Sequence, residues 1–333
     1  MALYLITGGC GFIGSHLAEN LLAQGHRVRI IDNLSTGKIS NLPASKSPSD
    51  CELVVGDVTD KATLQQCFEG VDYCFHLAAI ASVQLSNEDW AGTHQVNLTG
   101  SINVFDAART RQIPVVYASS AAVYGDNAES PLTESAVLRP LTAYGADKLG
   151  SELHARVASF VHAVPTTGLR FFNVYGPRQD SSSPYSGVIS IFAEKVSRQE
   201  SIAIYGDGDQ VRDFIYVKDV VQYLMAAMNR VSRTPSVFNV CTGRSTTINQ
   251  LARTIMSVSG RGVGIKYQAA RTGDIRVSVG APGLSERLLQ YRATESLASG
   301  LKKLIDYEFG DVAKSKGTGA RPAINMDRLV NAT

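Results

Sequence analysis

Residues 3–14 read LYLITGGCGFIG, and this stretch decides the fold. Its first five residues form a short apolar run of strand length, and a helical pattern follows from residue 13 to residue 23. Gly8, Gly11 and Gly14 lie between and at the start of these patterns. A tight turn, a backbone that approaches a pyrophosphate and a helix packed close to its strand all require glycine. The stretch therefore predicts a dinucleotide site at a helix N-terminus, whose free N–H groups and dipole favour phosphates.

Asp32 supports this prediction because it ends the next predicted strand, at 28–31. It lies 18 residues after Gly14. A carboxylate at that place accepts hydrogen bonds from the adenosine ribose and repels a 2′-phosphate, which favours NAD over NADP. Arg27 and Arg29 are close in sequence, and strand alternation is expected to point them away from the cofactor. Their charge leaves NADP open as an alternative.

The first half of the chain continues to alternate strand and helix patterns. Further short apolar segments occur at 51–55, 73–77, 115–119 and 168–172. This alternation predicts an α/β fold with a Rossmann-type doubly wound parallel sheet, which binds ligands beyond the carboxyl ends of its strands. Residues 214–217 and 237–240 are expected to return to the same sheet as strands.

A smaller α/β domain that binds the substrate is expected to interleave with this sheet. The rhythm of strands and helices changes at Asn173, and helical periodicity returns at 249–257 and 295–306. The expected division is 1–172 with about 213–245 for the NAD-binding domain, about 173–212 with 246–309 for the substrate domain, and 310–333 for a loose tail.

Composition and charge favour a cytoplasmic enzyme with a small-molecule substrate. The 333 residues include 32 basic and 30 acidic ones, and this balance gives no reason to expect nucleic acid or a membrane as partner. The start, MALYLITGG, does not read as a signal peptide, and no apolar run reaches membrane-spanning length. Five cysteines without a C-x-x-C pair favour reduced thiols and no metal site.

Tyr144 and Lys148 are the candidate catalytic pair. They lie four residues apart in YGADK, which places both side chains on one face of a helix. Tyrosine has a pKa of about 10, so a nearby ammonium and a positive nicotinamide ring are needed to stabilise its phenolate. Ser120 ends a predicted strand in YASSAAVYG and can relay a proton between Tyr144 and a substrate hydroxyl. Its neighbour Ser119 could be mistaken for it.

With these residues assembled, the sequence resembles the extended short-chain dehydrogenase/reductase family and, within it, the UDP-sugar 4-epimerases. The resemblance covers about residues 3–309. The motifs that carry it are TGGCGFIG, DNLSTGK, GDVTD, HLAA, SSAAVYG, YGADK, LRFFNVYGPRQD, GDGDQVRDFIYVKD and RTGDIRVS. It implies tightly bound NAD, a UDP-sugar as substrate and a homodimer.

The resemblance also implies a role for individual residues. Cofactor contacts would be Gly8, Gly11, Phe12, Ile13, Gly14, Asp32, Asn33, Ser35, Gly37, Asp57, Val58, Leu77, Ala78, Ala79, Asn97, Tyr144, Lys148 and Phe171. Substrate contacts would be Val83, Ser120, Tyr144, Asn173, Val188, Ala203, Tyr205, Arg212, Arg271, Asp274 and Ser278. Arg212 and Arg271 would clamp the diphosphate, since planar guanidinium groups bind phosphate oxygens in pairs. The alternative for Arg212 is an ion pair with Asp213.

The residues after Ser120 separate the reactions known in this family. Its 4,6-dehydratases carry an Asp-Glu pair where this chain has Ala121 and Ala122, and its UDP-glucuronate decarboxylases usually carry a Glu at the second position. Without the Asp-Glu pair, no obvious group there can protonate a departing 6-hydroxyl. Tyr144 as base and NAD as hydride acceptor suffice for 4-epimerisation through a 4-keto sugar.

Ser278 stands where the resemblance places a gate beside the 2-substituent of the sugar. A small gate residue admits an N-acetyl group, which favours UDP-GlcNAc and UDP-GalNAc, with UDP-glucose and UDP-galactose as further candidates. Ser278 is otherwise an ordinary strand residue. Two alternatives stay open: another NAD-dependent nucleotide-sugar enzyme, such as a UDP-glucuronate 4-epimerase, and a non-catalytic nucleotide-sensing protein. The joint presence of Ser120, Tyr144 and Lys148 argues against the second.

Overall fold

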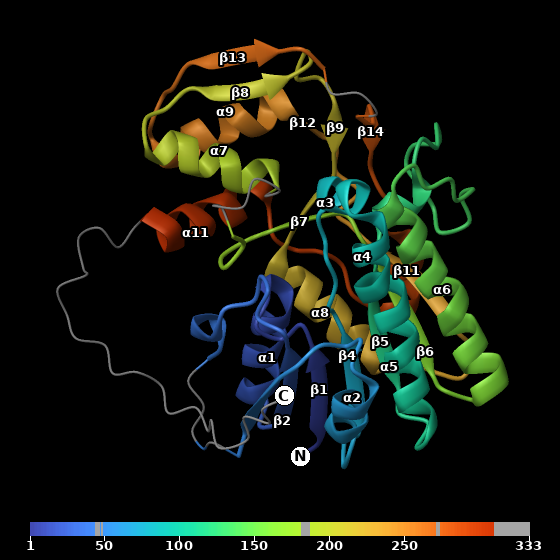
Figure 1. Ribbon diagram of the computed structural model, residues 1–333. Helices are drawn as coiled ribbons and strands as arrows, with labels where there is room; N and C mark the ends of the chain where they lie inside the picture. The colour runs from blue at the N-terminus through green and yellow to red at the C-terminus, as the bar shows by residue number, and fades with distance from the viewer. Residues whose placement is uncertain (44–46, 48, 181–186, 271–273, 310–333) are drawn as a thin grey trace.

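A seven-stranded parallel sheet forms the centre of the computed structural model (Figure 1). The described residues are 1–43, 47, 49–180, 187–270 and 274–309. The strands are β1 Leu3–Thr7, β2 Arg27–Asp32, β3 Cys51–Val55, β4 Tyr73–His76, β5 Val115–Ser120, β6 Thr166–Phe171 and β11 Ser236–Val240. They lie in the order β11-β6-β5-β4-β1-β2-β3, with every neighbouring pair parallel. This is the doubly wound α/β sheet that the sequence predicts.

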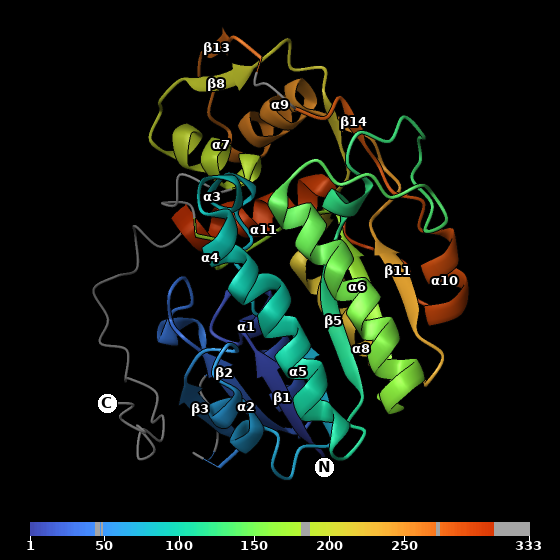
Figure 2. The same ribbon diagram turned by 45° about the vertical axis from the view of Figure 1, so that its right-hand side comes forward.

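Helices cover both faces of the sheet and make three layers (Figures 1 and 2). The helices of this part of the molecule are α1 Phe12–Ala23, α2 Lys61–Cys67, α3 Val83–Glu88, α4 Trp90–His94, α5 Gly100–Arg109, α6 Ala143–His162, α8 Val217–Met228 and α10 Gly283–Leu289. α1 and α8 pack against one face, whereas α2, α5 and α6 pack against the other. A π-helical turn, Gln95–Thr99, joins α4 to α5.

Both faces of the sheet are buried, as β1 illustrates. Tyr4 and Ile6 lie in the hydrophobic core beneath α1 and α8, while Leu3 and Leu5 lie in the core beneath α2, α5 and α6. Successive side chains of a strand point to opposite faces. A strand buried on both sides therefore needs apolar residues at every position, which is why the sequence there is an unbroken apolar run.

A smaller group of elements lies beside the carboxyl ends of the sheet (Figure 1). Its members are β7 Asn173–Tyr175, β8 Ile202–Tyr205, β9 Val211–Arg212, β10 Phe214–Tyr216, β12 Thr246–Thr247, β13 Ile265–Gln268, β14 Val277–Ser278, α7 Val188–Ser197, α9 Ile248–Ser259 and α11 Leu297–Phe309. The strands form three small sheets: β10 with β7, β13 with β8, and β9 between β12 and β14. The helices α7, α9 and α11 share one hydrophobic core.

One predicted strand belongs to a different sheet from the one expected. Residues 214–217 were expected in the central sheet, but β10 pairs with β7, with Phe214 opposite Asn173. The edge beside β6 is occupied by β11, as predicted for 237–240. β6 ends at Phe171 and the chain then leaves the sheet to form β7, so β10 has only β7 to join. The division into two domains with the boundaries given above stays a prediction, and the tail at 310–333 lies outside the described residues.

The cysteines of the chain are buried free thiols. Burial raises the pKa of Cys10 to about 12 and that of Cys51 to about 11, so both stay protonated at neutral pH. The described residues hold no cluster of three or more His, Cys, Asp or Glu side chains that could ligate a metal ion. No helix in the same ranges is long and apolar enough to cross a membrane.

Candidate active site

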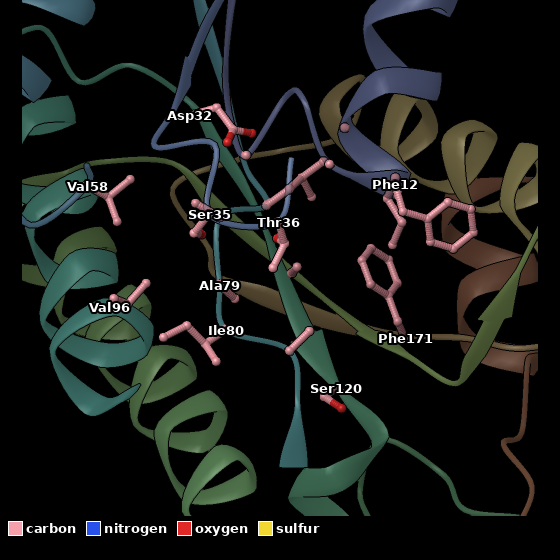
Figure 3. Close-up of a pocket in the computed structure, with 18 of the residues that line it drawn as sticks. Phe12, Asp32, Ser35, Thr36, Val58, Ala79, Ile80, Val96, Ser120 and Phe171 are labelled. Atoms are coloured by element: carbon pink, nitrogen blue, oxygen red, sulfur yellow. The ribbon is translucent and has the colours of Figure 1, made fainter. Parts of the chain in front are cut away.

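A cavity of about 510 Å³ opens at the carboxyl ends of β1, β2, β4 and β5 (Figure 3). A doubly wound sheet binds its ligands at this edge. In the view of Figure 3, Asp32 and Ser120 lie at opposite ends, and the ring of Phe12 faces that of Phe171. The predicted cofactor residues that line the cavity are Gly8, Gly11, Phe12, Ile13, Gly14, Asp32, Asn33, Ser35, Asp57, Val58, Leu77, Ala78, Ala79, Tyr144, Lys148 and Phe171. Gly37 and Asn97 do not line it.

The glycine turn has a shape that larger residues cannot adopt. Gly8 has a φ of +72°, and a Cβ there would lie 2.8 Å from the Ala78 Cα. A Cβ on Gly14 would clash with the Gly8 carbonyl oxygen. Gly11 is the N-cap of α1 and supplies no side-chain cap, so the first N–H groups of the helix face the cavity. This cradle fits the pyrophosphate of a dinucleotide.

Asp32 holds the turn in place from the end of β2. Its carboxylate accepts hydrogen bonds from the backbone N–H groups of Cys10 and Leu34, each at 2.9 Å. A Cβ on Gly37 would lie 2.7 Å from Asp32 Oδ1, so only glycine allows that loop to pass the carboxylate. Gly37 therefore shapes the loop beside Asp32 without lining the cavity itself.

The two arginines of β2 point away from the cavity, as strand alternation predicts. Arg29 Nε donates to the Glu52 carboxylate at 2.7 Å, and Arg27 Nε donates to the Ser49 carbonyl at 3.3 Å. Neither guanidinium group is placed to meet a 2′-phosphate beside Asp32. The site therefore fits NAD, and the two arginines do not support binding of NADP.

Asn97 lies behind the cavity wall and positions it. Its side-chain oxygen accepts from the Ile80 N–H at 2.8 Å, and its Nδ2 donates to the Ile80 carbonyl at 3.1 Å. Its own carbonyl accepts from the hydroxyls of Ser101 and Ser151 at 2.6 and 3.3 Å. Since Ile80 lines the cavity, Asn97 supports the hydrogen bonding of the site from one layer further out.

Ser120, Tyr144 and Lys148 meet at the end of the cavity opposite Asp32. Burial raises the pKa of Tyr144, whereas a hydrogen bond with the Ser120 hydroxyl lowers it. Lys148 Nζ lies 5.7 Å from the centre of the Tyr144 ring and donates to the Ala118 carbonyl at 2.9 Å. Burial lowers the pKa of Lys148 to about 8, while the charge of Asp147 raises it. The arrangement can stabilise a phenolate by a neighbouring cation.

Strand alternation separates Ser120 from Ser119. Ser119 donates to the Glu152 carboxylate at 2.5 Å, and Glu152 forms a two-bond pair with Arg170 at 2.8 and 2.7 Å. All three side chains are buried. Ser119 borders the cavity but belongs to this network, which ties β5 to α6 and β6, and Ser120 is the serine that is hydrogen-bonded to Tyr144.

Most of the predicted substrate residues belong to the smaller group of elements. They are Asn173 in β7, Val188 at the start of α7, Ala203 and Tyr205 in β8, Arg212 in β9, Asp274 between β13 and β14, and Ser278 in β14, with Val83 at the start of α3. Ala203 and Tyr205 share the exposed face of β8. Arg271 lies outside the described residues. Of the whole set, Ser120 and Tyr144 line the cavity.

Arg212 pairs with Asp274, at 2.6 Å, and not with its neighbour Asp213. The Asp213 carboxylate instead accepts from the N–H groups of Thr242 and Gly243, at 2.9 and 2.8 Å. The alternative partner expected for Arg212 is therefore wrong, because the Asp213 carboxylate is directed to the Thr242 and Gly243 N–H groups. Two residues predicted to contact UDP, Arg212 and Asp274, thus form an ion pair with each other in this structure.

Several residues of the cavity wall were missed by the sequence analysis. They are Ile31, Thr36, Gly56, Ile80, Ala81, Val96, Ala118, Ser119, Phe172, Val174 and Gln179. Most are direct neighbours of predicted residues, which is a signal that could have found them. Gln179 has no such signal; its side-chain oxygen accepts from the Ser190 hydroxyl at 2.9 Å, which brings a polar group from the loop after β7 to the cavity.

The chain matches the NAD dependent epimerase/dehydratase family over residues 4–241. It is 34% identical over 310 residues to a putative UDP-glucose 4-epimerase of Methanocaldococcus jannaschii, which covers 92% of this chain and 98% of that protein. It is 35% identical over 231 residues to a UDP-N-acetyl-alpha-D-glucosaminuronate decarboxylase of Bacillus cytotoxicus, covering 68% and 70%.

Among solved structures, the fold is similar to that of the UDP-N-acetylglucosamine 4-epimerase from Methanobrevibacter ruminantium in complex with UDP-N-acetylmuramic acid. The TM-score is 0.87 and the identity 36%, with 93% of this chain and 99% of that chain covered. Sequence and fold agree over the same span, and the glycine cradle and Asp32 fit the cofactor. The chain therefore belongs to the NAD dependent epimerase/dehydratase family.

Proposed function

We propose that the protein is a UDP-sugar 4-epimerase that interconverts UDP-GlcNAc and UDP-GalNAc and also accepts UDP-glucose and UDP-galactose. One observation carries the proposal: Tyr144, Ser120 and Lys148 meet at one end of the cavity, and two alanines rather than acids follow Ser120. Ala121 and Ala122 follow Ser120 in a short 3₁₀ turn, where a dehydration would need a carboxyl group to protonate the departing hydroxyl.

In the proposed reaction, Tyr144 takes the proton of the sugar 4-hydroxyl and returns it at the end. Ser120, hydrogen-bonded to Tyr144, passes the proton between the phenol and the sugar oxygen. Lys148 stabilises the phenolate by its charge. Bound in the cradle of Gly8, Gly11 and Gly14, NAD would supply a reversible hydride acceptor for C4 and would be regenerated in each cycle. The 4-keto sugar must turn between the two transfers so that its other face is presented.

The alternatives differ in what they require of the chain. A decarboxylase is disfavoured because this chain has Ala122 at the position where the UDP-glucuronate decarboxylases of the family usually carry a Glu. A UDP-glucuronate 4-epimerase would use the same three residues and differs only in the sugar. A non-catalytic nucleotide sensor would have no use for a buried Lys148 beside Tyr144 at the cavity end.

The purified protein is expected to turn over UDP-GlcNAc without added NAD. The cofactor is regenerated in each cycle, so it should stay bound and be released only when the protein is denatured. UDP-GlcNAc, UDP-glucose and UDP-glucuronate are incubated separately, and the products are resolved by NMR. Turnover of UDP-glucuronate alone would favour the uronate epimerase, and no turnover of any of them by NAD-loaded protein would favour the sensor. Full activity in protein free of NAD would refute the mechanism.

The proposed preference for N-acetylated sugars depends on Ser278. It is the register partner of Arg212 across β14 and β9. Side chains at paired positions of parallel strands point to the same face, so Ser278 and the proposed diphosphate ligand Arg212 share a face. A small side chain at that place supports the role of a gate that leaves room for a 2-acetamido group.

Ser278→Tyr is expected to lower kcat/KM for UDP-GlcNAc and UDP-GalNAc while UDP-glucose and UDP-galactose are spared. The added ring overfills the space of the acetamido group, which typically costs about 1–3 kcal/mol. That corresponds to roughly a five- to hundredfold loss. The measured quantity is the ratio of kcat/KM for the two substrate types. An unchanged ratio would show that Ser278 does not face the sugar.

We also propose that the protein is a cytoplasmic homodimer that associates through α6. Leu153, Val157 and Phe160 are 59%, 47% and 62% exposed and recur at helical spacing, which makes an apolar stripe on this helix. Two copies of one stripe can pack against each other about a two-fold axis.

Val157→Glu is expected to convert the dimer to a monomer, measured by light scattering. A charge in an apolar interface must lose its hydration on association, which opposes dimer formation. The matched control is Leu288→Glu, at an apolar residue of α10 with 46% exposure, which should leave the mass unchanged. A monomer already present in the unaltered protein would contradict the proposal.

A further inference from the structure

Asp213 is a buried carboxylate that the proposed reaction does not use. It lies between β9 and β10 and has a solvent exposure of 0%. Its Oδ1 accepts from the Thr242 N–H at 2.9 Å and from the Thr242 hydroxyl at 2.6 Å, and its Oδ2 accepts from the Gly243 N–H at 2.8 Å. The Gly280 N–H also donates to this carboxylate. Donors from two separate segments of the chain therefore converge on one buried side chain.

The main chain of Asp213 contacts residues that are predicted to bind the substrate. Its N–H donates to the Ser278 carbonyl at 3.0 Å. Its carbonyl accepts from the N–H and from Nδ2 of Asn173, at 3.0 and 3.1 Å. Arg212 directly precedes it in the chain. Three predicted substrate residues are therefore each one peptide bond or one hydrogen bond away from Asp213.

The donors on the carboxylate belong to segments at the carboxyl edge of the central sheet. Thr242 and Gly243 follow directly after β11, which pairs with β6 in that sheet. Gly280 is packed against the same edge, because a Cβ there would lie 2.7 Å from the Phe172 ring. Phe172 in turn lines the cofactor cavity. The carboxylate therefore ties β9 and β14, which lie beyond this edge (Figure 1), to the sheet that carries the cavity.

We propose that Asp213 is a positioning residue for the nucleotide-sugar. Its carboxylate holds Asn173, Arg212 and Ser278 at a fixed place relative to the central sheet. The inference rests on the proposed function, because the substrate contacts of these three residues belong to it. Hydride transfer requires C4 of the sugar at a defined place beside the cofactor site, and a misplacement of about 1 Å can cost a hundredfold in rate. The sheet provides the cofactor site and the smaller group of elements provides the sugar-nucleotide contacts, so the bonds of Asp213 align the two.

Asp213→Asn keeps the shape of the side chain and removes one of its two acceptor atoms. An amide has a single acceptor oxygen, so its NH₂ group would face the N–H of either Thr242 or Gly243, and that N–H loses its partner. UDP is the probe, and its Kd is measured by calorimetry on the folded protein as purified. The Kd is expected to rise at least about tenfold. The amount of NAD released on denaturation should equal that of the unaltered protein, because the glycine cradle is unchanged.

Asp219→Asn is the matched control. Asp219, in α8, is 4% exposed, and its carboxylate accepts from the N–H groups of Thr294 and Glu295 at 3.1 and 3.0 Å and from the Tyr291 hydroxyl at 2.6 Å. The control removes the same kind of acceptor from a buried carboxylate whose hydrogen bonds go to a segment outside the predicted substrate contacts. It should lower the thermal unfolding midpoint about as much as Asp213→Asn does and leave the Kd of UDP unchanged.

An unchanged Kd in Asp213→Asn would overturn the inference. An equal rise in Asp219→Asn would also overturn it, because the effect would then come from destabilisation in general. If Asp213→Asn does not fold, Thr242→Val takes its place: it removes only the hydroxyl donor, and the Kd should rise about threefold. No change in that variant would overturn the inference equally. Absence of UDP binding by the unaltered protein would refute the UDP-sugar proposal together with this inference, whereas the expected shift in a protein that converts no sugar would refute only the epimerase.

Discussion

Tyr144→Phe is expected to lose at least about a hundredfold in turnover, the lower range for removal of a general base. The substitution removes the hydroxyl that accepts the sugar proton and keeps the ring and its packing. Substrate affinity should persist, since the phenol contributes to the transition state more than to binding. Initial rates at saturating UDP-GlcNAc, with a separate binding measurement, give both quantities.

The control for this variant is Tyr307→Phe. Tyr307 lies in α11, is 54% exposed and takes no part in the cavity, so losing its hydroxyl should leave turnover unchanged. Turnover of Tyr144→Phe within a few-fold of normal would mean that another group is the base. Loss of binding together with turnover would mean that the phenol holds the substrate in its ground state.

Glu152→Leu is expected to lower the free energy of unfolding by about 3–5 kcal/mol, the usual result of removing one partner of a buried ion pair. Glu152 and Arg170 have side chains that are only 7% and 5% exposed. The Glu152 carboxylate also accepts a hydrogen bond from the Ser119 hydroxyl, and Arg170 donates to the Tyr124 hydroxyl at 2.9 Å. Without Glu152, the buried guanidinium charge loses its ion-pair partner. Denaturant unfolding gives the difference in free energy.

A matched control uses the same substitution in a helical pair that lies closer to solvent. Glu194 pairs with Arg198 one turn along α7, at 2.8 Å, and the Arg198 side chain is 63% exposed. Water screens such a pair, so Glu194→Leu should change the free energy of unfolding by less than about 1 kcal/mol. Equal effects of the two substitutions would show that burial of the Glu152–Arg170 pair does not matter to stability.

The cofactor half of the site could be predicted from the sequence because its determinants are local. The turn at Gly8 and Gly14 follows directly from backbone freedom and from the space that a Cβ would need. Tyr144 and Lys148 share a face of α6 because the helix repeats every 3.6 residues. Ser119 and Ser120 point to opposite faces of β5 because successive side chains of a strand alternate. The roles given to individual residues of this site stay predictions until the variants are measured.

Contacts between distant segments could not be predicted in the same way. Arg212 and Asp274 lie 62 residues apart, and Asp147 and His94 lie 53 apart. The sequence contains each of these charges but nothing that says which of them meet. The same holds for Gln179, which reaches the cavity only because the loop after β7 passes over it, and for β10, whose partner depends on where β6 ends.

The sequence by itself determined the doubly wound sheet, the dinucleotide turn and the pairing of Tyr144 with Lys148, because strand and helix periodicity act over a few residues. Tertiary structure alone decided which charged side chains form pairs, such as Arg212 with Asp274. The strength of the electrostatic interaction between two charges depends on how far they are buried, and burial arises only when the core packs. Lys148 illustrates both: its place in the helix is local, whereas its lowered pKa and its hydrogen bond to the Ala118 carbonyl exist only once α6 has packed against the sheet.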